Sequence, residues 1–600
     1  MLSSGVLKHQ QHVGLQKVSA LAGLAHSSLG PCKSYKFIQE EGSREAALAC
    51  SCVRLLQSLE LSCAVGQLVS ETVRTHHGAY GSGSACLLFM SGAWSRAALE
   101  SLRRGIPAPR LVYAMSEGLD ICLQACRKHS VPLDVVNTPP SPSLSTQAQA
   151  RRPQHKGPGN IKLTHSRYFC EAPASPAQNH RDLGPAARAL SHGGVRSMEL
   201  VLQASLLQSA TGAAGAEARC SALDIGRVVT CVVPGLSEDQ ACVLAGCVVR
   251  LPAEGAVVAQ RMSGQPLRVA LVTGDLCARY RHLGSKSPTG VSHVTDRLDR
   301  GGSGGEAQWT ASVLTALLRL GVNLVLVSGA TSGALSPQCL AHRVLLVDRV
   351  RLPALKAIAE ATGAVPVTYA SQLSERCVGT GVTLTPWRDL GDHQAVSIST
   401  LAGAGLATAV LTSCVPAKLR ALEDEFWACA HRLHRALQDG ALLPGAGVIE
   451  MVCVRDLQRH AQQHLTLPGE AGAAPGLYRD TVLMLMADAL TDYVATVTAN
   501  SGQCSKLHSW TAAGQEVKRL GAQGQMGLGG VSGEAAQGQM GLGGVSGEAA
   551  QGRVYDNLSV KVEAWRRAMD LVLLVLQTDA EVITGIDPEA LRTETDLMLL

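Results

Sequence analysis

The strongest constraint on the fold lies between residues 269 and 369, where two kinds of hydrophobic period alternate. A stripe of helical period runs from Val313 to Leu320, and Gly321 follows it as a natural stop. Strand–helix alternation of this kind predicts a parallel α/β unit. The β-branched runs predicted to form its strands are Val269–Val272, Val322–Val327, Val344–Val347 and Val365–Tyr369.

Long helical patterns with few breakers flank this unit. They cover Val53–Thr75, Glu423–Ala436 and Val562–Leu576. In the last segment apolar residues recur at three- and four-residue spacing through Trp565, and further apolar residues fill its final turns. Such a helix must be buried on nearly every side. The sequence therefore predicts an α/β protein with a large all-helical part.

Composition limits the number of domains and the kinds of partner. A chain of 600 residues is too long for one hydrophobic core and suggests roughly two to four domains. Its apolar fraction of 46% excludes wholesale disorder, and the 3% of aromatic residues leaves packing to leucine, valine and alanine. The net charge of +5, without a basic stripe interleaved with aromatic residues, argues against nucleic acid as a partner.

The sequence shows no targeting or membrane segment. The N-terminal segment Met1–Lys17 lacks the apolar core of a secretory signal. The longest uninterrupted apolar stretches, such as Leu571–Leu576, are far too short to cross a bilayer, so we expect an intracellular chain without membrane insertion. The 19 cysteines are scattered and odd in number, which favours free buried thiols over disulfides. The sequence contains neither a C-x-x-C pair nor an H-E-x-x-H motif, so neither pattern predicts a metal site.

Two segments break the globular pattern. The segment Asn137–His180 is rich in proline, serine, glutamine and arginine, which predicts a disordered insertion. The glycine-rich segment Gln523–Ala536 is repeated as Gln537–Ala550, and two copies are too few for a solenoid. Replication slippage within a tolerant surface loop explains the repeat more simply than a functional role does, although both interpretations stay open.

Three glycine turns, far apart in the sequence, contain the candidate functional residues. Backbone N–H groups at such turns and at helix N-termini can hold phosphates without side-chain chemistry. The turns are Leu29-Gly30-Pro31, Gly81-Ser82-Gly83-Ser84 and Gly445-Ala446-Gly447-Val448-Ile449-Glu450. They resemble the L-G-P-K-G, G-D-G-T-T and G-G-G-A-x-E turns that form the nucleotide pocket of the group II chaperonins.

The resemblance to this family covers most of the chain, from Gly14 to about Thr584. Gly105–Pro109 resembles the family's G-I-H-P turn, Gly321–Val327 its G-x-N-V-V strand, and Ala361–Ala364 its A-T-G-A motif. The order and spacing of these motifs, rather than any single one, make the chain similar to group II chaperonins. Within that family, segments 14–38, 53–69 and 553–585 are similar to the divergent chaperonin-like proteins of Bardet–Biedl syndrome.

The resemblance implies a three-domain group II chaperonin protomer with equatorial, intermediate and apical domains. The apical α/β domain would comprise residues 222–365. The intermediate domain would comprise 119–221, with the insertion at about 137–180, and 366–409. The equatorial domain would be assembled from both chain ends, 1–118 and 410–600, with the glycine-rich insertion at about 521–552.

The carboxylates that ATP hydrolysis needs are missing from the sequence. Hydrolysis requires Mg²⁺, which prefers hard oxygen ligands, and a group that orients the attacking water. The family has an aspartate at three places where this chain has Ala49, Ser82 and Ala428. The resemblance therefore implies a protein that is not an enzyme, binds no catalytic metal and requires no cofactor; residual ATP binding stays open.

A vestigial nucleotide pocket would be lined by the glycine turns and one acid at the family's position near the ribose. Against nucleotide binding, Cys32-Lys33-Ser34-Tyr35 replaces the family's K-G-M-D, and Ala446 adds a methyl group where glycine allows close approach. The interpretation we favour is that the glycines serve backbone turns that need positive φ. The candidate pocket residues are Gly30, Pro31, Gly81, Gly83, Ser84, Gly445, Gly447 and Asp556.

The resemblance implies a noncatalytic assembly factor. Relatives of this type act with other Bardet–Biedl chaperonin-like proteins and t-complex chaperonin subunits, and their clients are subunits of the BBSome, a coat-like complex that carries membrane proteins to cilia. The implied locations are the cytoplasm, the centrosome or basal body, and the cilium. Two alternatives stay open: an ATP-dependent protein-folding chaperonin subunit, and a structural scaffold at the basal body without a chaperone role.

Overall fold

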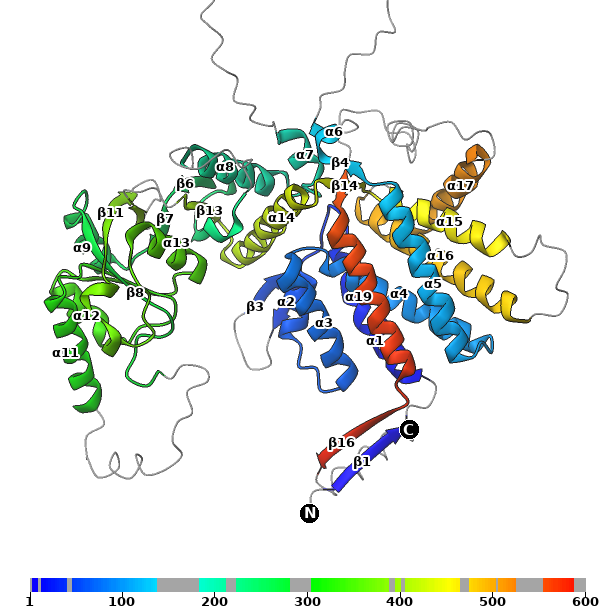
Figure 1. The fold of residues 1–600 in the computed structure, drawn as a ribbon, viewed down its shortest axis with the longest axis horizontal. Helices are drawn as coiled ribbons and strands as arrows, with labels where there is room; N and C mark the ends of the chain where they lie inside the picture. The colour runs from blue at the N-terminus through cyan, green and yellow to red at the C-terminus, as the bar shows by residue number, and fades with distance from the viewer. Residues whose placement is uncertain are drawn as a thin grey trace, which may run out of the picture.

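The computed structural model describes eleven stretches of the chain, which gather around separate hydrophobic cores (Figure 1). We divide the described residues into three parts, which we name the helical block, the sheet block and the middle block. The predicted insertion at 137–180 and the repeat at 523–550 lie almost entirely outside the described residues. The described stretches are 3–8, 12–39, 46–137, 183–211, 223–280, 304–387, 394–400, 405–463, 474–502, 505–524 and 554–586.

The helical block is assembled from both ends of the chain. Its central helix α4 packs against α1, α3, α16 and α19, so that N-terminal and C-terminal segments share one core. Two fully buried tryptophans, Trp94 and Trp565, lie in that core. The helices are α1 (Val13–Ala22), α2 (Cys52–Ser58), α3 (Ala64–Tyr80), α4 (Ser84–Arg103), α5 (Ala108–Lys128), α15 (Val448–Gln463), α16 (Ala474–Asn500), α17 (Lys506–Gly524) and α19 (Leu558–Gln577).

Two small antiparallel sheets border the helical block. β1 (Ser3–Lys8) pairs with β16 (Ala580–Ile586), which brings the two ends of the described chain side by side (Figure 1). β2 (Lys36–Gln39) and β3 (Ala46–Ala49) form a second pair next to α2. The first pair joins residues that are more than 570 positions apart, so both ends of the described chain belong to one structural unit.

The sheet block contains a six-stranded sheet with apolar side chains on both faces. Val269 and Leu271 of β8 face one core with α9 and α13, and the alternate residues Ala270 and Val272 face a second core with α11 and α12. The strand order is β10-β9-β8-β11-β12-β7. The elements are β7 (Cys247–Arg250), α9 (Ala253–Arg261), β8 (Leu267–Val272), α11 (Gly304–Arg319), β9 (Leu324–Val327), α12 (Leu335–Ala341), β10 (Leu345–Val347), α13 (Leu352–Thr362), β11 (Gly379–Trp387) and β12 (Ala395–Thr400).

The parallel α/β unit predicted from the alternating pattern is confirmed for three of its four strands. β8, β9 and β10 are parallel neighbours, and Gly321 follows α11 with a φ of 62°. The fourth prediction, a strand at Val365–Tyr369, is wrong, because this segment makes only one isolated parallel bridge, from Val367 to Val272. The backbone N–H groups of Thr368 and Tyr369 instead donate to the Gln372 side chain, at 2.9 and 3.0 Å, which ends the pairing with β8.

The middle block lies between the other two and contains a three-stranded sheet of order β5-β13-β6. Its core includes Leu190, Met198, Phe426 and Leu433, so the apolar side of α14 belongs to this block. The predicted domain boundary at 410 stays a prediction. The elements are α7 (Gly184–Ala189), α8 (Val195–Thr211), β5 (Val228–Pro234), β6 (Cys242–Ala245), β13 (Ala407–Ser413) and α14 (Leu419–Asp439).

A small sheet of order β15-β14-β4 joins the middle block to the helical block. We call it the linking sheet. β4 (Val131–Pro132) follows α5 and leads into α6 (Leu133–Asn137), β14 (Ala441–Pro444) follows α14, and β15 (Tyr555–Asn557) precedes α19. The described chain therefore passes between these two blocks through one compact sheet.

The long helical patterns outside the sheet block are confirmed with one correction. The segments 423–436 and 562–576 lie within α14 and α19, and between residues 562 and 576 only Asp570 and Leu574 are exposed. The predicted helix Val53–Thr75 is in fact two helices, α2 and α3. The break arises because Cys63 adopts an extended conformation and its thiol accepts a hydrogen bond from the Gly66 N–H, which begins α3 anew.

One helix within the described stretches is long and apolar enough to cross a membrane, at Tyr478–Asn500 in α16. The structure places it in the helical block, against α4, α5 and α15, with 61% of its most apolar window buried. A core helix of a globular protein passes the same test of length and composition. The packing of α16 accounts for its apolar sequence.

We expect Trp565→Ala to lower the free energy of unfolding by about 3–5 kcal/mol, because the indole is fully buried in α19 and its removal leaves a large cavity. Chemical denaturation of the purified chain measures this loss. Leu574→Ala on the same helix is the matched control: its side chain is 52% exposed, so we expect a change of about 0.5 kcal/mol or less. Normal stability of Trp565→Ala would contradict the packing described here.

Candidate functional site

A cavity of about 560 Å³ lies between the helical block and the middle block. One face of α14 forms a wall through Asp424, Ala428 and His431, while the other face of that helix packs in the middle-block core. The opposite wall contains the end of α3 and the beginning of α4. Of the predicted pocket residues, Gly30, Gly81, Gly83, Ser84 and Asp556 line this cavity, whereas Pro31, Gly445 and Gly447 are not among its lining residues.

The second glycine turn connects α3 to α4 at the cavity wall. Gly81 and Gly83 have φ values of 64° and 79°, which favour glycine. A Cβ atom on Gly81 would lie 2.1 Å from the His431 ring, and one on Gly83 would lie 2.5 Å from Val560 Cγ1. Both glycines are therefore required by the backbone and by close packing, independently of any ligand. The turn also points the N-terminus of the long helix α4 toward the cavity.

The first and third turns pack against α16. Gly30 has a φ of 81°, and a Cβ atom there would lie 3.2 Å from the Val497 carbonyl oxygen. Gly447 has a φ of 88° and would place a Cβ atom 2.9 Å from Val494. Ala446, between the two glycines of the third turn, also has a positive φ, 54°, which disfavours alanine. The first and third turns thus lie against the same helix, α16.

The three positions where the family has aspartates differ in whether they line the cavity. Ser82 and Ala428 line it, while Ala49 is buried at the end of β3 and only its neighbours Cys50 and Ser51 reach the cavity. The Ser82 hydroxyl is buried and makes no hydrogen bond. In the part of the chain that the structure describes, no group of three histidine, cysteine or acidic side chains is arranged to hold a metal ion.

The acids that do line the cavity are engaged by the protein itself. Asp424 accepts two hydrogen bonds from Arg54, at 2.6 and 2.7 Å, and Glu425 accepts one from Ser197 at 2.8 Å. Asp556 is bound by Lys561. Each carboxylate that could approach a metal is therefore already used in a contact between elements of the fold.

Lys33 is a cavity-lining cation that sequence comparison with the family motif missed. The family has its lysine directly after L-G-P, whereas here Cys32 takes that place and the lysine follows one position later. A search that allowed a one-residue shift in the motif would have found it. Lys33 brings a positive charge to the same cavity as the N-terminus of α4, and both favour an anion.

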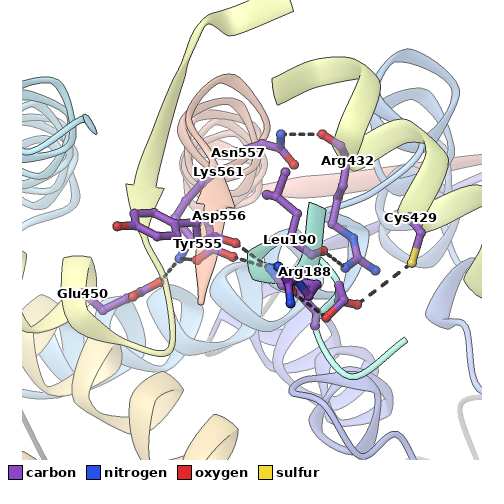
Figure 2. Close-up of polar contacts among 11 residues, drawn as sticks. Arg188, Leu190, Cys429, Arg432, Glu450, Tyr555, Asp556, Asn557 and Lys561 are labelled. Atoms are coloured by element: carbon purple, nitrogen blue, oxygen red, sulfur yellow. Dashed lines mark hydrogen bonds and ion pairs between the residues drawn. The ribbon is translucent and has the colours of Figure 1, made fainter. Parts of the chain in front are cut away.

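A buried ion cluster at the edge of the cavity joins three elements (Figure 2). Lys561 of α19 lies between Asp556 of β15, at 2.5 Å, and Glu450 of α15, with which it makes a very short contact. Tyr493 of α16 adds an aromatic face 5.9 Å from the ammonium group. The lysine side chain is 6% exposed and the Glu450 side chain is fully buried. The cluster therefore holds α15, α19 and the linking sheet together in a water-poor environment.

The two carboxylates of this cluster share one cation, Lys561, and they differ in how readily they ionise. Burial opposes ionisation of Asp556, but Lys561 and His192 together hold its pKa below the usual value. Burial raises the pKa of Glu450 against the attraction of Lys561, and the second oxygen of this carboxylate has no hydrogen-bond partner. The pKa of Lys561 is raised well above its usual value because the two carboxylates outweigh the cost of burial. The ammonium group stays charged, and Asp556 is its main counter-ion.

Three histidines around the cavity are uncharged at neutral pH. Burial lowers the pKa of His76, His192 and His431 to about 4 in each case, and nearby cations such as Arg567, Arg432 and Arg435 act in the same direction. His76 donates a hydrogen bond to the Ser82 carbonyl oxygen at 3.1 Å, and His192 donates one to the Tyr555 carbonyl oxygen at 2.7 Å. His76 and His192 therefore act as neutral donors, and the His431 ring packs against Gly81 across the cavity boundary.

The fold and the cavity geometry are accompanied by a clear family match. The model of the TCP-1/cpn60 chaperonin family matches residues 174–585, about two thirds of the chain, and the chain belongs to this family. The similarity to chaperonins inferred from the glycine turns is thereby confirmed.

Among its relatives, the chain is similar to proteins named Chaperonin-containing T-complex member BBS12. It is 32% identical to those of Mus musculus, Homo sapiens and Xenopus laevis. The aligned regions cover 97%, 98% and 96% of this chain and the same shares of the respective relatives. The similarity that segments 14–38, 53–69 and 553–585 indicated thus extends over nearly the full length.

We expect Lys561→Met to destabilise the chain by about 3–5 kcal/mol, because two buried carboxylates would lose their only cation within the cluster. Denaturation at neutral pH and at about pH 5 measures the effect. The loss of stability should be smaller at about pH 5, because the carboxylates left without Lys561 take up protons more readily there. Lys506→Met is the control, since Lys506 is 47% exposed and pairs with Asp492 at the surface; we expect a cost below about 1 kcal/mol. Equal stability of Lys561→Met and the unmodified chain would contradict a structural role for the cluster.

We also expect stability to fall as the pH falls from about 6.5 to 5. Unfolded histidines bind protons below about 6.5 whereas the folded rings resist protonation until about 4, so acid favours the unfolded state by up to about 1.4 kcal/mol per pH unit for each ring. His431 faces His77, His434 and Arg435, and all three oppose its protonation. His431→Gln should therefore flatten the slope of stability against pH, measured by denaturant titration.

The control for this experiment is His508→Gln, at an exposed position on α17, which should leave the slope unchanged. An identical slope for His431→Gln and the unmodified chain would show that the His431 ring is not held neutral by the fold.

Proposed function

We propose that this chain is a noncatalytic chaperonin-like assembly factor, built as a three-domain protomer. In this proposal the helical block is the equatorial domain, the middle block the intermediate domain and the sheet block the apical domain. The single observation that carries the proposal is the cavity, which is lined by glycines of the first two turns but has Ser82 and Ala428 where the family has aspartates. Ala49, the third such position, is an alanine in contact with neither solvent nor cavity.

A magnesium nucleotide does not fit the side chains that line this cavity. Mg²⁺ would require free carboxylate or other hard oxygen ligands, and the nearby acids Asp424 and Asp556 are held by Arg54 and Lys561. The N-terminus of α4 and Lys33 still favour a phosphate group. We infer that the protein needs no cofactor and that any nucleotide held there would stay unhydrolysed.

The names of the relatives suggest the partners. The mouse and human relatives are named as members of a chaperonin-containing T-complex. We infer that this chain associates with t-complex chaperonin subunits and with other Bardet–Biedl chaperonin-like proteins, and that BBSome subunits are the clients whose assembly it supports. Action in the cytoplasm, at the centrosome or basal body, and in the cilium follows from that role in ciliogenesis and ciliary trafficking.

The complex purified through a tag on this chain should contain newly made client subunits. It should turn over ATP no faster than the same complex prepared without this chain. Pulse labelling followed by mass determination identifies the clients and the stoichiometry. Recovery of only finished ciliary complexes would instead favour a structural scaffold at the basal body.

The isolated chain should show no magnesium-dependent ATP hydrolysis above a mock preparation, because a lost metal site costs orders of magnitude in rate. Turnover by the isolated chain that disappears in Gly83→Trp would identify an ATP-dependent folding subunit and overturn the proposal.

A further inference from the structure

Some of the contacts that border the cavity lie near the linking sheet, and others lie far from it. α14 ends at Asp439, next to β14 of that sheet, and its N-terminal half reaches over the cavity. Asp424 lies about 22 Å along the helix from Asp439, at 1.5 Å per residue. A small change in angle at the linking sheet would therefore move Asp424 a long way from the helical block.

Near the linking sheet, several short contacts fix α14. Asn557 donates a hydrogen bond to the Arg432 carbonyl oxygen at 2.8 Å, and the Ser559 N–H donates one to Asp439 at 3.0 Å (Figure 2 shows the first). The Arg435 guanidinium stacks on the Tyr80 ring, 4.9 Å from its centroid. These contacts lie close to the point where the chain passes between the blocks, so they restrain the swing of the far end of α14 only weakly.

At the far end, Arg54 of α2 holds Asp424 in a two-pronged ion pair. The Arg54 Nε and Nη2 atoms donate to the two carboxylate oxygens at 2.6 and 2.7 Å. Such a pair requires a defined distance and orientation between α2 and α14. The side chains are 34% and 26% exposed, so water can replace the contact when it breaks. This combination of strict geometry and access to water suits a contact that opens and closes.

We propose that the Arg54–Asp424 pair is a latch that holds α14 against the helical block and sets access to the cavity between them. Breaking the pair lets the middle block swing about the linking sheet. Within the described residues, no covalent connection joins the middle block to the helical block at the end of α14 that lies far from the linking sheet. The proposal rests on this geometry and stands whether or not the protein assembles ciliary complexes.

Alkylation of the native Cys50 thiol tests the latch, because Cys50 lines the cavity and is 9% exposed. Asp424→Asn and Arg54→Gln should each accelerate labelling of Cys50 by a neutral reagent about fivefold, the scale expected for a partly exposed ion pair. Cys122, fully buried in the helical block, is the internal reference and should label at an unchanged rate.

The two substitutions separate opening of the cavity from a direct effect of charge. Burial raises the pKa of the Cys50 thiol first of all, and the negative charge of Asp424 raises it further. Removing that charge would favour the reactive thiolate, whereas removing the positive charge of Arg54 would disfavour it. A purely electrostatic effect therefore changes the labelling rate in opposite directions, and the latch changes it in the same direction.

Three further comparisons complete the test. The exchanged pair Arg54→Asp with Asp424→Arg should restore slow labelling. Glu117→Gln, which breaks a two-pronged Arg479–Glu117 pair inside the helical block, should leave Cys50 labelling unchanged. In the unmodified chain, raising the salt concentration to about 1 M should accelerate labelling of Cys50 but not of Cys122, because salt screens partly exposed pairs.

Opposite changes in the two single variants, or failure of the exchanged pair to slow labelling, would overturn the proposal. If the variants do not fold, a labelling rate of Cys50 in the unmodified chain that is independent of salt would overturn it as well.

Discussion

Lys561 and the two carboxylates beside it connect the parts of this molecule that the chain leaves far apart. Glu450 belongs to α15, Asp556 to the linking sheet and Lys561 to α19, and their contact brings the third glycine turn next to the C-terminal helix. Charges are costly to bury, so each of these groups depends on the others. His192 extends the cluster into the middle block through its contact with Asp556 at 3.2 Å. The cluster thus ties α15, α19, the linking sheet and the middle block together beside the cavity.

The surroundings of the cavity show that the fold itself requires the glycines of the second turn, whether or not a ligand binds there. Gly81 and Gly83 are needed because His431 and Val560 lie directly against them, and because their φ values exclude most other residues. Ser82 and Ala428 lie at the cavity wall, and neither has a positive φ that would require glycine. Selection for the fold alone would therefore keep the glycines and release the carboxylates.

Polar side chains now occupy the boundary between the helical and middle blocks. Arg54 with Asp424, His192 with Tyr555, and Asn557 with Arg432 each join residues from different blocks or from the linking sheet. The apolar cores on either side are separate, so the relative position of the blocks depends on these polar contacts more than on hydrophobic burial. Polar boundaries of this kind respond to pH and salt, whereas the cores do not.

Local patterns in the sequence determined the parallel strands β8, β9 and β10, the helices α14 and α19, and the glycine turns with positive φ, because periodicity and backbone strain act over a few residues. They failed at Val365–Tyr369 and at Cys63, where the side chains of Gln372 and Cys63 outweighed the surrounding period. Only the tertiary structure could show that Arg54 meets Asp424, 370 positions away. Pairs so distant leave no periodic trace in the sequence, since their contact arises only when separately folded blocks are brought together.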